Sequence, residues 1–364
     1  MVMLRNVWYH NGRIISVRII HTLERMEHDA KVFDGTSGRS SHCDASTSSE
    51  WMRCQHFTDG SSPPRVAFIP QLIGIPYFTA MEHGGQAAAK RFHVDFNYDG
   101  PTTASAASQL SIYDSLIAQH YNAISISVLD PNTIDGAIAR ARKEGIVALT
   151  TDSDSPNSVR QAFVSEASNK ALGYTLADQL AKELHGHGQV GIVSGSPTAT
   201  NLNAWIGYIK QRLTSTYPHM SIVDTLYAGG SSSTSLQDAQ NIMAAYPHVR
   251  ALIAVASSNI PGVCQAVEDA HKVGSVTVTG YGSPMTVKPY MQAGVMKVSI
   301  LWNPYNLGYL DVWAMRQFVL HRPLKPINHV PGLSHPITWN PQTKVLLLGK
   351  PLVITPNNVG QFDF

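Results

Sequence analysis

The chain has 364 residues, more than one ordinary hydrophobic core organises, and this length suits two packed units with an extension. Hydrophobic residues make up 43% of the sequence and charged residues 14%, as is typical of a globular protein with a lightly charged surface. The formal net charge is +2 and no long Lys/Arg run occurs. The sequence therefore does not favour binding to nucleic acid or to an anionic membrane surface.

Cysteine and histidine usage gives no sign of a metal or disulfide framework. The three cysteines are widely spaced and form no CxxC pair, and Cys264 lies in an apolar stretch that predicts a buried thiol. The closest histidine pair is His185 and His187, and two ligands are fewer than a metal site needs. We expect no metal and no cofactor.

Residues 1–64 differ from the rest of the chain. The stretch 34–64 is rich in Ser, Thr, Gly and Asp, which predicts a poorly ordered N-terminal extension. The first twenty residues are interrupted by three arginines and lack the apolar core of a secretory signal. No apolar run is long enough to predict a membrane-spanning helix.

From Arg65 onward, strand and helix patterns alternate along the chain. Each predicted strand is a short apolar run bounded by Gly, Pro or Asp, and each predicted helix repeats apolar residues every three to four positions. Strands are predicted at 65–70, 96–100, 123–128, 146–152, 189–195, 221–229, 251–257, 276–282 and 295–303. Helices are predicted at 81–92, 104–120, 133–145, 172–184, 203–218, 235–247, 261–274 and 285–294. Repeated βα units predict an α/β fold, and so many strands favour two doubly wound parallel sheets in two lobes.

Ligands of open α/β sheets bind beyond the carboxyl ends of the strands, so the residues after each strand are the candidate site. Amides, hydroxyls, carboxylates and aromatic rings gather there, which are the groups that bind sugars. The candidate ligand-binding residues are Gln71, Tyr77, Phe78, Asp152, Asp154, Asn201, Trp205, Ser257, Ser283, Trp302 and Asn303.

The same segments carry a family resemblance over residues 65–364. They include AFIPQLIGIPYFTAMEHGGQAAAK, TTDSDS, SGSPTATNLNAW, ALIAVASSN, ILWNPYNLGYL and the final NNVGQFDF. In this order they resemble the type I periplasmic sugar-binding proteins, the substrate-binding components of ABC importers. The resemblance is closest to the autoinducer-2-binding and rhamnose-binding branch.

The resemblance implies two lobes joined by three crossing segments that close over a ligand. It implies an N-terminal lobe of residues 65–165 plus 285–325 and a C-terminal lobe of residues 166–284 plus 326–364. Asp152 matches an acidic ligand contact of the autoinducer-2 site. Elsewhere the chain departs from that site, because the family lysine is Gln71 here, the family Asp-Gln pair is Asn201-Leu202, and two main-chain contacts fall at Val255 and Ser257. The loss of charged partners favours a neutral pentose, deoxyhexose or polyol.

Several candidates also have ordinary structural explanations. Asp154 could cap a turn, and Asn201 could cap the helix that it precedes. Trp205 and Trp302 could stack on a sugar or pack within the protein. Catalysis is not expected, because no nucleophile, metal set or second carboxylate cluster accompanies Asp152.

The expected function is therefore that of a periplasmic solute-binding protein that delivers a small sugar or polyol to the membrane permease of an ABC importer. It is expected to act as a monomer and without nucleic acid. An autoinducer-2-type signal-binding protein is one alternative, and a sensor that presents its bound ligand to a receptor kinase is another. A lactose-repressor-type regulator is a third, although the Ser- and Gly-rich stretch 34–64 does not suit a helix-turn-helix.

Overall fold

The computed structural model describes residues 9–10, 13–14 and 62–364. The strands β1 (Tyr9–His10) and β2 (Arg13–Ile14) pair antiparallel in a unit that spans Met1–Gly60. The expectation of a poorly ordered extension at 1–64 falls almost wholly outside the described residues. The second unit, Ser61–Phe364, holds all the other helices and strands of the described residues.

An eight-stranded sheet forms the first lobe of this unit, in the order β13-β14-β15-β7-β6-β5-β3-β4. Its strands are β3 (Arg65–Ile69), β4 (Asp95–Tyr98), β5 (Ala123–Ile126), β6 (Val147–Thr151), β7 (Ala162–Ala167), β13 (Ile327–Asn328), β14 (Ile337–Asn340) and β15 (Val345–Gly349). Its helices are α1 (Pro76–Phe92), α2 (Ala106–Ala118), α3 (Pro131–Lys143) and α9 (Pro304–Val319). The six neighbouring strands β15, β7, β6, β5, β3 and β4 run parallel, β14 pairs antiparallel with β15, and β13 pairs antiparallel with β14.

Both faces of this sheet are covered, as strand alternation requires. Val66 and Phe68 belong to the core cluster that includes residues of α1 and α9, whereas Ala67 and Ile69 belong to the cluster that includes residues of α2 and α3. Successive side chains of β3 thus face opposite helix layers.

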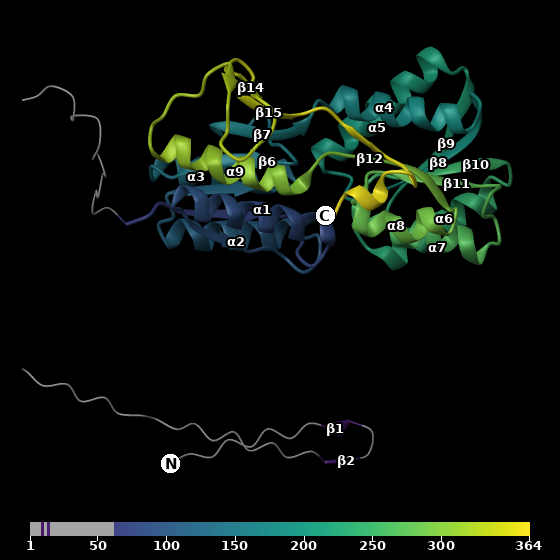
Figure 1. The fold of residues 1–364 in the computed structure, drawn as a ribbon, viewed down its shortest axis with the longest axis horizontal. Helices are drawn as coiled ribbons and strands as arrows, with labels where there is room; N and C mark the ends of the chain where they lie inside the picture. Colours follow the sequence, from purple (N-terminus) through teal and green to yellow (C-terminus); the bar gives the residue numbers. More distant parts are fainter. Residues whose placement is uncertain (1–8, 11–12, 15–61) are drawn as a thin grey trace, which may run out of the picture. The chain divides into compact units, whose positions relative to one another are not determined.

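A six-stranded sheet forms the second lobe, in the order β16-β12-β11-β10-β8-β9 (Figure 1). Its strands are β8 (His187–Ser194), β9 (His219–Tyr227), β10 (Val249–Ala254), β11 (Thr277–Gly280), β12 (Met296–Leu301) and β16 (Leu352–Ile354), of which β16 is antiparallel. Its helices are α4 (Asn169–Glu183), α5 (Thr200–Thr216), α6 (Ser232–Ala245), α7 (Ile260–Asp269) and α8 (Pro284–Gln292), and two short 3-10 helices are η1 (Ser257–Asn259) and η2 (Val359–Gln361). None of the helices in the described part of the chain is long and apolar enough to cross a membrane.

The chain passes between the two sheets three times: from β7 to α4, from β12 to α9 and from β15 to β16. The expected α/β fold of two doubly wound lobes joined by a three-segment hinge is therefore confirmed. Strand pairing divides the chain differently from the expected lobe boundaries in two places. Residues 296–301, expected in the first lobe, pair with β11 of the second sheet, and residues 327–349, expected in the second lobe, form three strands of the first.

Proline and short polar side chains start the helices immediately after the strands. Proline occupies the first turn of α1, α3, α8 and α9, where its missing N–H costs no helical hydrogen bond. Ser105, Asp130, Ser168, Ser283 and Asn303 accept hydrogen bonds from main-chain N–H groups as N-caps. These short strand-to-helix connections place the strand ends of both lobes at the cleft between them.

Helices α1 and α9 approach one another at two glycines. A Cβ atom at Gly84 would lie 1.9 Å from the Tyr305 carbonyl oxygen, and one at Gly308 would lie 2.0 Å from the Met81 carbonyl oxygen. The absence of side chains at these two positions lets the two backbones touch, and no other residue type fits without moving a helix.

We predict that Gly308→Ala lowers the free energy of unfolding by about 1–3 kcal/mol, because the helices must separate. Gly207→Ala on α5 is the matched control, since a Cβ there meets no atom within 4 Å. The control is expected to raise stability by about 0.5–1 kcal/mol. The urea midpoint followed by circular dichroism measures both, and an unchanged midpoint for Gly308→Ala would contradict this account of the packing.

Candidate functional site

A small cavity of about 50 Å³ lies between the two lobes at the strand ends. Its walls come from both lobes and from one crossing segment of the hinge. They are Gln71, Leu72, Ile75, Tyr77, Phe78, Asp152, Asn201, Leu202, Trp205, Val255, Ala256, Ser257, Ser258, Tyr281, Leu301 and Trp302. Side chains of the second lobe donate hydrogen bonds to main-chain carbonyl oxygens of the first, so the lobes are closed over this cavity.

Asp152 is the charged group of this cavity. It follows β6, is 4% exposed, and adopts the left-handed backbone region at φ 64°, which Asp tolerates better than most residues. The Tyr77 hydroxyl donates to Oδ1 at 2.7 Å, and the Ser127 hydroxyl donates to Oδ2 at 2.5 Å. Each carboxylate oxygen can accept more than one hydrogen bond, so both can still accept from a ligand.

Burial raises the pKa of Asp152 to about 6, and the hydrogen bonds from Ser127 and Tyr77 oppose this rise. The carboxylate is therefore ionised at neutral pH. No Lys, Arg or His belongs to the cavity lining formed by residues 62–364, so no cation of that region is placed there to neutralise a charged ligand.

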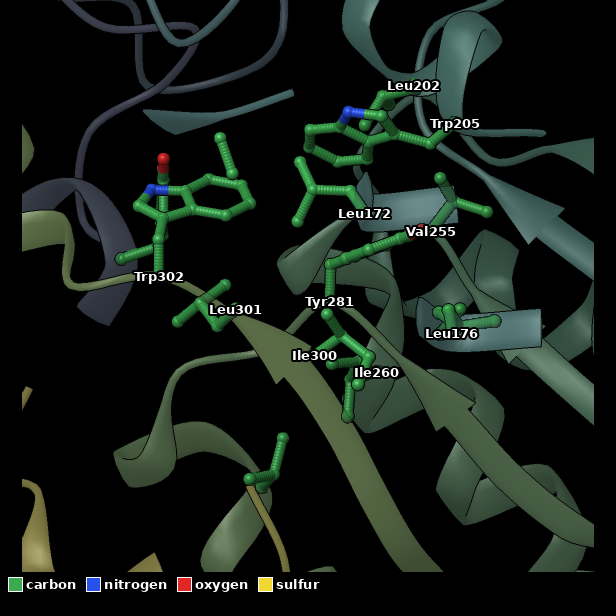
Figure 2. Close-up of a cluster of buried hydrophobic side chains, with 14 of the residues drawn as sticks. Leu172, Leu176, Leu202, Trp205, Val255, Ile260, Tyr281, Ile300, Leu301 and Trp302 are labelled. Atoms are coloured by element: carbon green, nitrogen blue, oxygen red, sulfur yellow. The ribbon is translucent and has the colours of Figure 1, made fainter. Parts of the chain in front are cut away.

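Five aromatic rings form a continuous wall of the cavity. Tyr77 meets Trp302 edge-on with ring centroids 5.8 Å apart, and Trp302 meets Trp205 at 5.6 Å. Tyr281 packs on Trp205 at 4.5 Å, and Phe78 packs on Tyr77 at 5.0 Å. Figure 2 shows Trp205 on α5, Tyr281 after β11 and Trp302 after β12 among the surrounding aliphatic side chains.

Three polar atoms in the cavity wall are buried and have no hydrogen-bond partner among the described residues. They are the Ser257 hydroxyl, the Tyr281 hydroxyl and the Trp302 indole Nε1. Buried polar groups in proteins are nearly always hydrogen-bonded, because leaving one unpaired costs about 1–3 kcal/mol. Three such groups on residues that line one cavity with Asp152 indicate a site shaped for a polar ligand with several hydroxyl groups.

The structure brings eight of the eleven candidate residues to this cavity: Gln71, Tyr77, Phe78, Asp152, Asn201, Trp205, Ser257 and Trp302. Asn201 lies inside α5, whose N-cap is Ala199, so the alternative that Asn201 caps this helix is wrong. Its side chain instead donates to the Asp152 carbonyl oxygen at 3.3 Å. The Trp205 indole N–H donates to Asn169 at 2.9 Å, which leaves only the ring for a ligand.

The other three candidates lie outside the cavity lining, each for a visible reason. Asp154 forms a two-pronged ion pair with Arg160, at 2.5 Å and 2.6 Å, in place of a turn cap. Ser283 and Asn303 cap α8 and α9. They lie outside the lining of the interlobe cavity, and their contact with a ligand stays a prediction.

The pattern of strand ends missed Tyr281. Strand β11 ends at Gly280, so Tyr281 is the first residue beyond it, whereas the expected strand continued to residue 282. A predicted strand that ended at Gly280 would have made Tyr281 a candidate ligand-binding residue.

The closed lobes are joined by hydrogen bonds from the segment 198–201 to main-chain carbonyls of the first lobe. Thr198 Oγ1 donates to the Leu129 carbonyl oxygen at 2.8 Å, and Thr200 Oγ1 donates to that of Asp154 at 2.7 Å. With the Asn201 contact described above, these bonds form what we call the interlobe latch, Thr198, Thr200 and Asn201. They exist only while the lobes are closed.

Cys264 is fully buried, as expected, and burial raises the pKa of its thiol. His185 and His187 share a hydrogen bond through the His185 carbonyl oxygen, and His187 stacks on His219. Across the described residues, no three His, Cys, Asp or Glu side chains gather in a group that could hold a metal ion.

Comparison with known proteins places this geometry in a family. Residues 66–322 match the model described as the periplasmic binding protein domain. The D-ribose/D-allose-binding protein of Pseudomonas aeruginosa is 27% identical over 252 residues, which cover 64% of this chain and 74% of that protein. The D-allose-binding periplasmic protein of Escherichia coli is 24% identical over 265 residues, which cover 69% of this chain and 83% of that protein.

Solved structures agree with this fold. A solute-binding protein from Clostridium phytofermentas with bound L-rhamnose has a TM-score of 0.77 at 24% identity, covering 83% of this chain and 98% of its own. LsrB from Clostridium saccharobutylicum in complex with AI-2 also has a TM-score of 0.77 at 24% identity, covering 82% of this chain and 100% of its own. The resemblance expected from the sequence is confirmed, and the chain belongs to the periplasmic binding protein domain family.

Proposed function

We propose that this protein is the solute-binding component of a sugar importer, and that it holds a small neutral sugar or polyol in the interlobe cavity by lobe closure. The observation that carries the proposal is the set of unpaired polar groups of Ser257, Tyr281 and Trp302, three residues that line the same cavity as Asp152. A sugar supplies hydroxyl groups that both donate and accept, so one ligand can satisfy all of them.

The character of the cavity wall favours a sugar over a charged solute. Asp152 accepts from hydroxyl donors, and the aromatic rings suit the apolar face of a sugar ring. A sugar acid would bring a second negative charge beside Asp152 without a compensating cation in the described lining. The names of the relatives, which bind ribose and allose, point to the same class of ligand.

Autoinducer-2 is less suited to this cavity. The resemblance to its binding proteins implies a lysine and an aspartate that are Gln71 and Asn201 here. A lactose-repressor-type function would need a DNA-binding headpiece in residues 1–64, and this segment lies almost wholly outside the described residues. We also propose that the protein acts in the periplasm as a monomer. Its closed form is presented to a membrane permease, and the protein performs no chemistry on its ligand.

A thermal-shift screen of pentoses, deoxyhexoses, hexoses, polyols and autoinducer-2 tests the proposal. At a hundred times its dissociation constant, a ligand stabilises the protein by about 2.7 kcal/mol, so at least one sugar is expected to raise the melting temperature measurably. Asp152→Asn should abolish the shift, whereas Asp95→Asn on the exposed end of β4 should retain it. If no sugar or polyol shifts the transition, the proposed function is wrong.

We also predict that sugar affinity depends on pH through Asp152. Its pKa of about 6 means that the carboxylate accepts hydroxyl donors above pH 6 and becomes protonated below it. Affinity should therefore fall as the pH drops below about 6, approaching tenfold per pH unit. Calorimetric titrations of the wild-type protein between pH 5 and 8 would measure this, and an affinity that stays constant across that range would contradict the role of Asp152.

The interlobe latch gives a third prediction. Thr198→Val together with Thr200→Val removes two donors to the opposite lobe but changes no residue of the cavity lining. Two hydrogen bonds worth about 1 kcal/mol each favour the closed form, so the double variant should bind sugar about tenfold or more weakly.

Small-angle scattering of the same variant without sugar should give a larger radius of gyration than wild type. Thr214→Val is the control, since Thr214 is an exposed residue near the opposite end of α5 from the latch. Unchanged affinity and unchanged radius would show that the latch does not control closure.

A further inference from the structure

A second cavity lies at the hinge and is separate from the interlobe cavity. Its volume is about 250 Å³, and residues from all three crossing segments contribute to its wall. Glu166 is the second-last residue of β7, Trp302 and Asn303 follow β12, and Lys350 follows β15. A ligand in this cavity would touch every segment that moves when the lobes open.

Glu166 is the unusual group of the hinge cavity. Its side chain is 0% exposed, and neither carboxylate oxygen has a hydrogen-bond partner among residues 62–364. Burial and the nearby charge of Asp152 raise the pKa of Glu166 well above its usual range, so the neutral acid is favoured until a cation enters the cavity and stabilises the carboxylate. A buried carboxylate is ordinarily paired with a cation or with several donors, because removing it from water is costly.

The described protein does not supply that partner. Lys350 and His335 are the basic residues of the cavity wall, both are exposed, and neither forms an ion pair with Glu166. The rest of the wall combines apolar side chains, such as Ile337 and Phe362, with the amide of Asn303. A carboxylate at a buried end with apolar sides complements a small organic cation.

We propose that the hinge cavity binds a small organic molecule through its ammonium group, which pairs with the carboxylate of Glu166. A bare metal ion suits the site poorly, because Glu166 would be its only carboxylate ligand and most of the wall is apolar. The ammonium group would donate to both carboxylate oxygens, while the carbon chain lies against the apolar wall.

Trp302 connects this site to the interlobe cavity, because it lines both. Occupation of the hinge cavity would fix the crossing segments and the indole that faces the sugar site. Binding at the two sites should therefore be coupled, and linkage requires the coupling to be reciprocal. Amine binding itself does not depend on the sugar proposal and is tested without sugar.

The test is calorimetric titration of the full chain at pH 7.5 with propylamine, 4-aminobutyrate and propanol. Propylamine, a cation at this pH, is expected to bind saturably at one site, and propanol is not. Glu166→Gln should weaken propylamine binding about tenfold or more, because the charge-assisted pairing is lost. Glu144→Gln, an exposed glutamate at the end of α3, should leave it unchanged.

The zwitterion 4-aminobutyrate distinguishes two sources of the ammonium group. Equal or tighter binding than propylamine supports an amino acid whose carboxylate meets Lys350 and His335 at the exposed rim, and weaker binding supports a simple amine. If Glu166→Gln fails to fold, Ser334→Trp replaces it as the blocking variant, since Ser334 is an exposed loop residue of the cavity wall. The proposal is overturned if propylamine gives no saturable binding, or if the folded blocking variant binds it as wild type does.

Discussion

The burial of Asp152 where the two lobes meet is the constraint on which the rest of the site depends. A carboxylate removed from water needs donors, and the first lobe supplies two, from Tyr77 on α1 and Ser127 after β5. The second lobe reaches the same segment through Asn201, which donates to the Asp152 main chain. Lobe closure and the electrostatics of the site are therefore linked, because the interlobe latch binds the main chain of the same residue whose carboxylate accepts from Tyr77 and Ser127.

Two buried carboxylates, Asp152 of the interlobe cavity and Glu166 of the hinge cavity, have different surroundings. Asp152 receives two hydroxyl donors, whereas Glu166 receives none from the described residues. Two nearby carboxylates with unequal surroundings take different protonation states, and the one with donors stays ionised to lower pH. This difference leaves Asp152 as an acceptor for hydroxyl groups, whereas a cation in the hinge cavity would stabilise the ionised form of Glu166. Trp302 separates the two cavities and can transmit a change in one to the other.

Much of this architecture could be predicted from the sequence, because it follows local rules. Alternating strand and helix patterns gave the two-lobed α/β fold, and the rule that ligands bind beyond strand ends identified Gln71, Asp152 and Trp302. The rule that ligands bind beyond strand ends selected residues outside the cavity where the side chain is already bound by another group of the protein. Asp154 is bound by Arg160, and Ser283 is used by the first turn of its own helix. Neither partnership changes the strand pattern around these residues.

Other features depend on pairings that no local pattern encodes. Strand β15 joins the first sheet because it pairs with β7, almost two hundred residues earlier in the chain, and this pairing moves residues 327–349 into the first lobe. Glu166 looks like an ordinary polar residue of a strand until the three crossing segments bury it. Tyr281 was missed because the end of β11 lies earlier than its apolar pattern suggests.

The most direct measurement is a crystal structure with the sugar that stabilises the protein most. The account predicts one sugar in the interlobe cavity, with hydroxyl groups on both Asp152 oxygens, hydrogen bonds to Ser257, Tyr281 and Trp302 Nε1, and its ring against the aromatic wall. Sugar density elsewhere, or a sugar in this cavity that makes no contact with the Asp152 carboxylate, would contradict it.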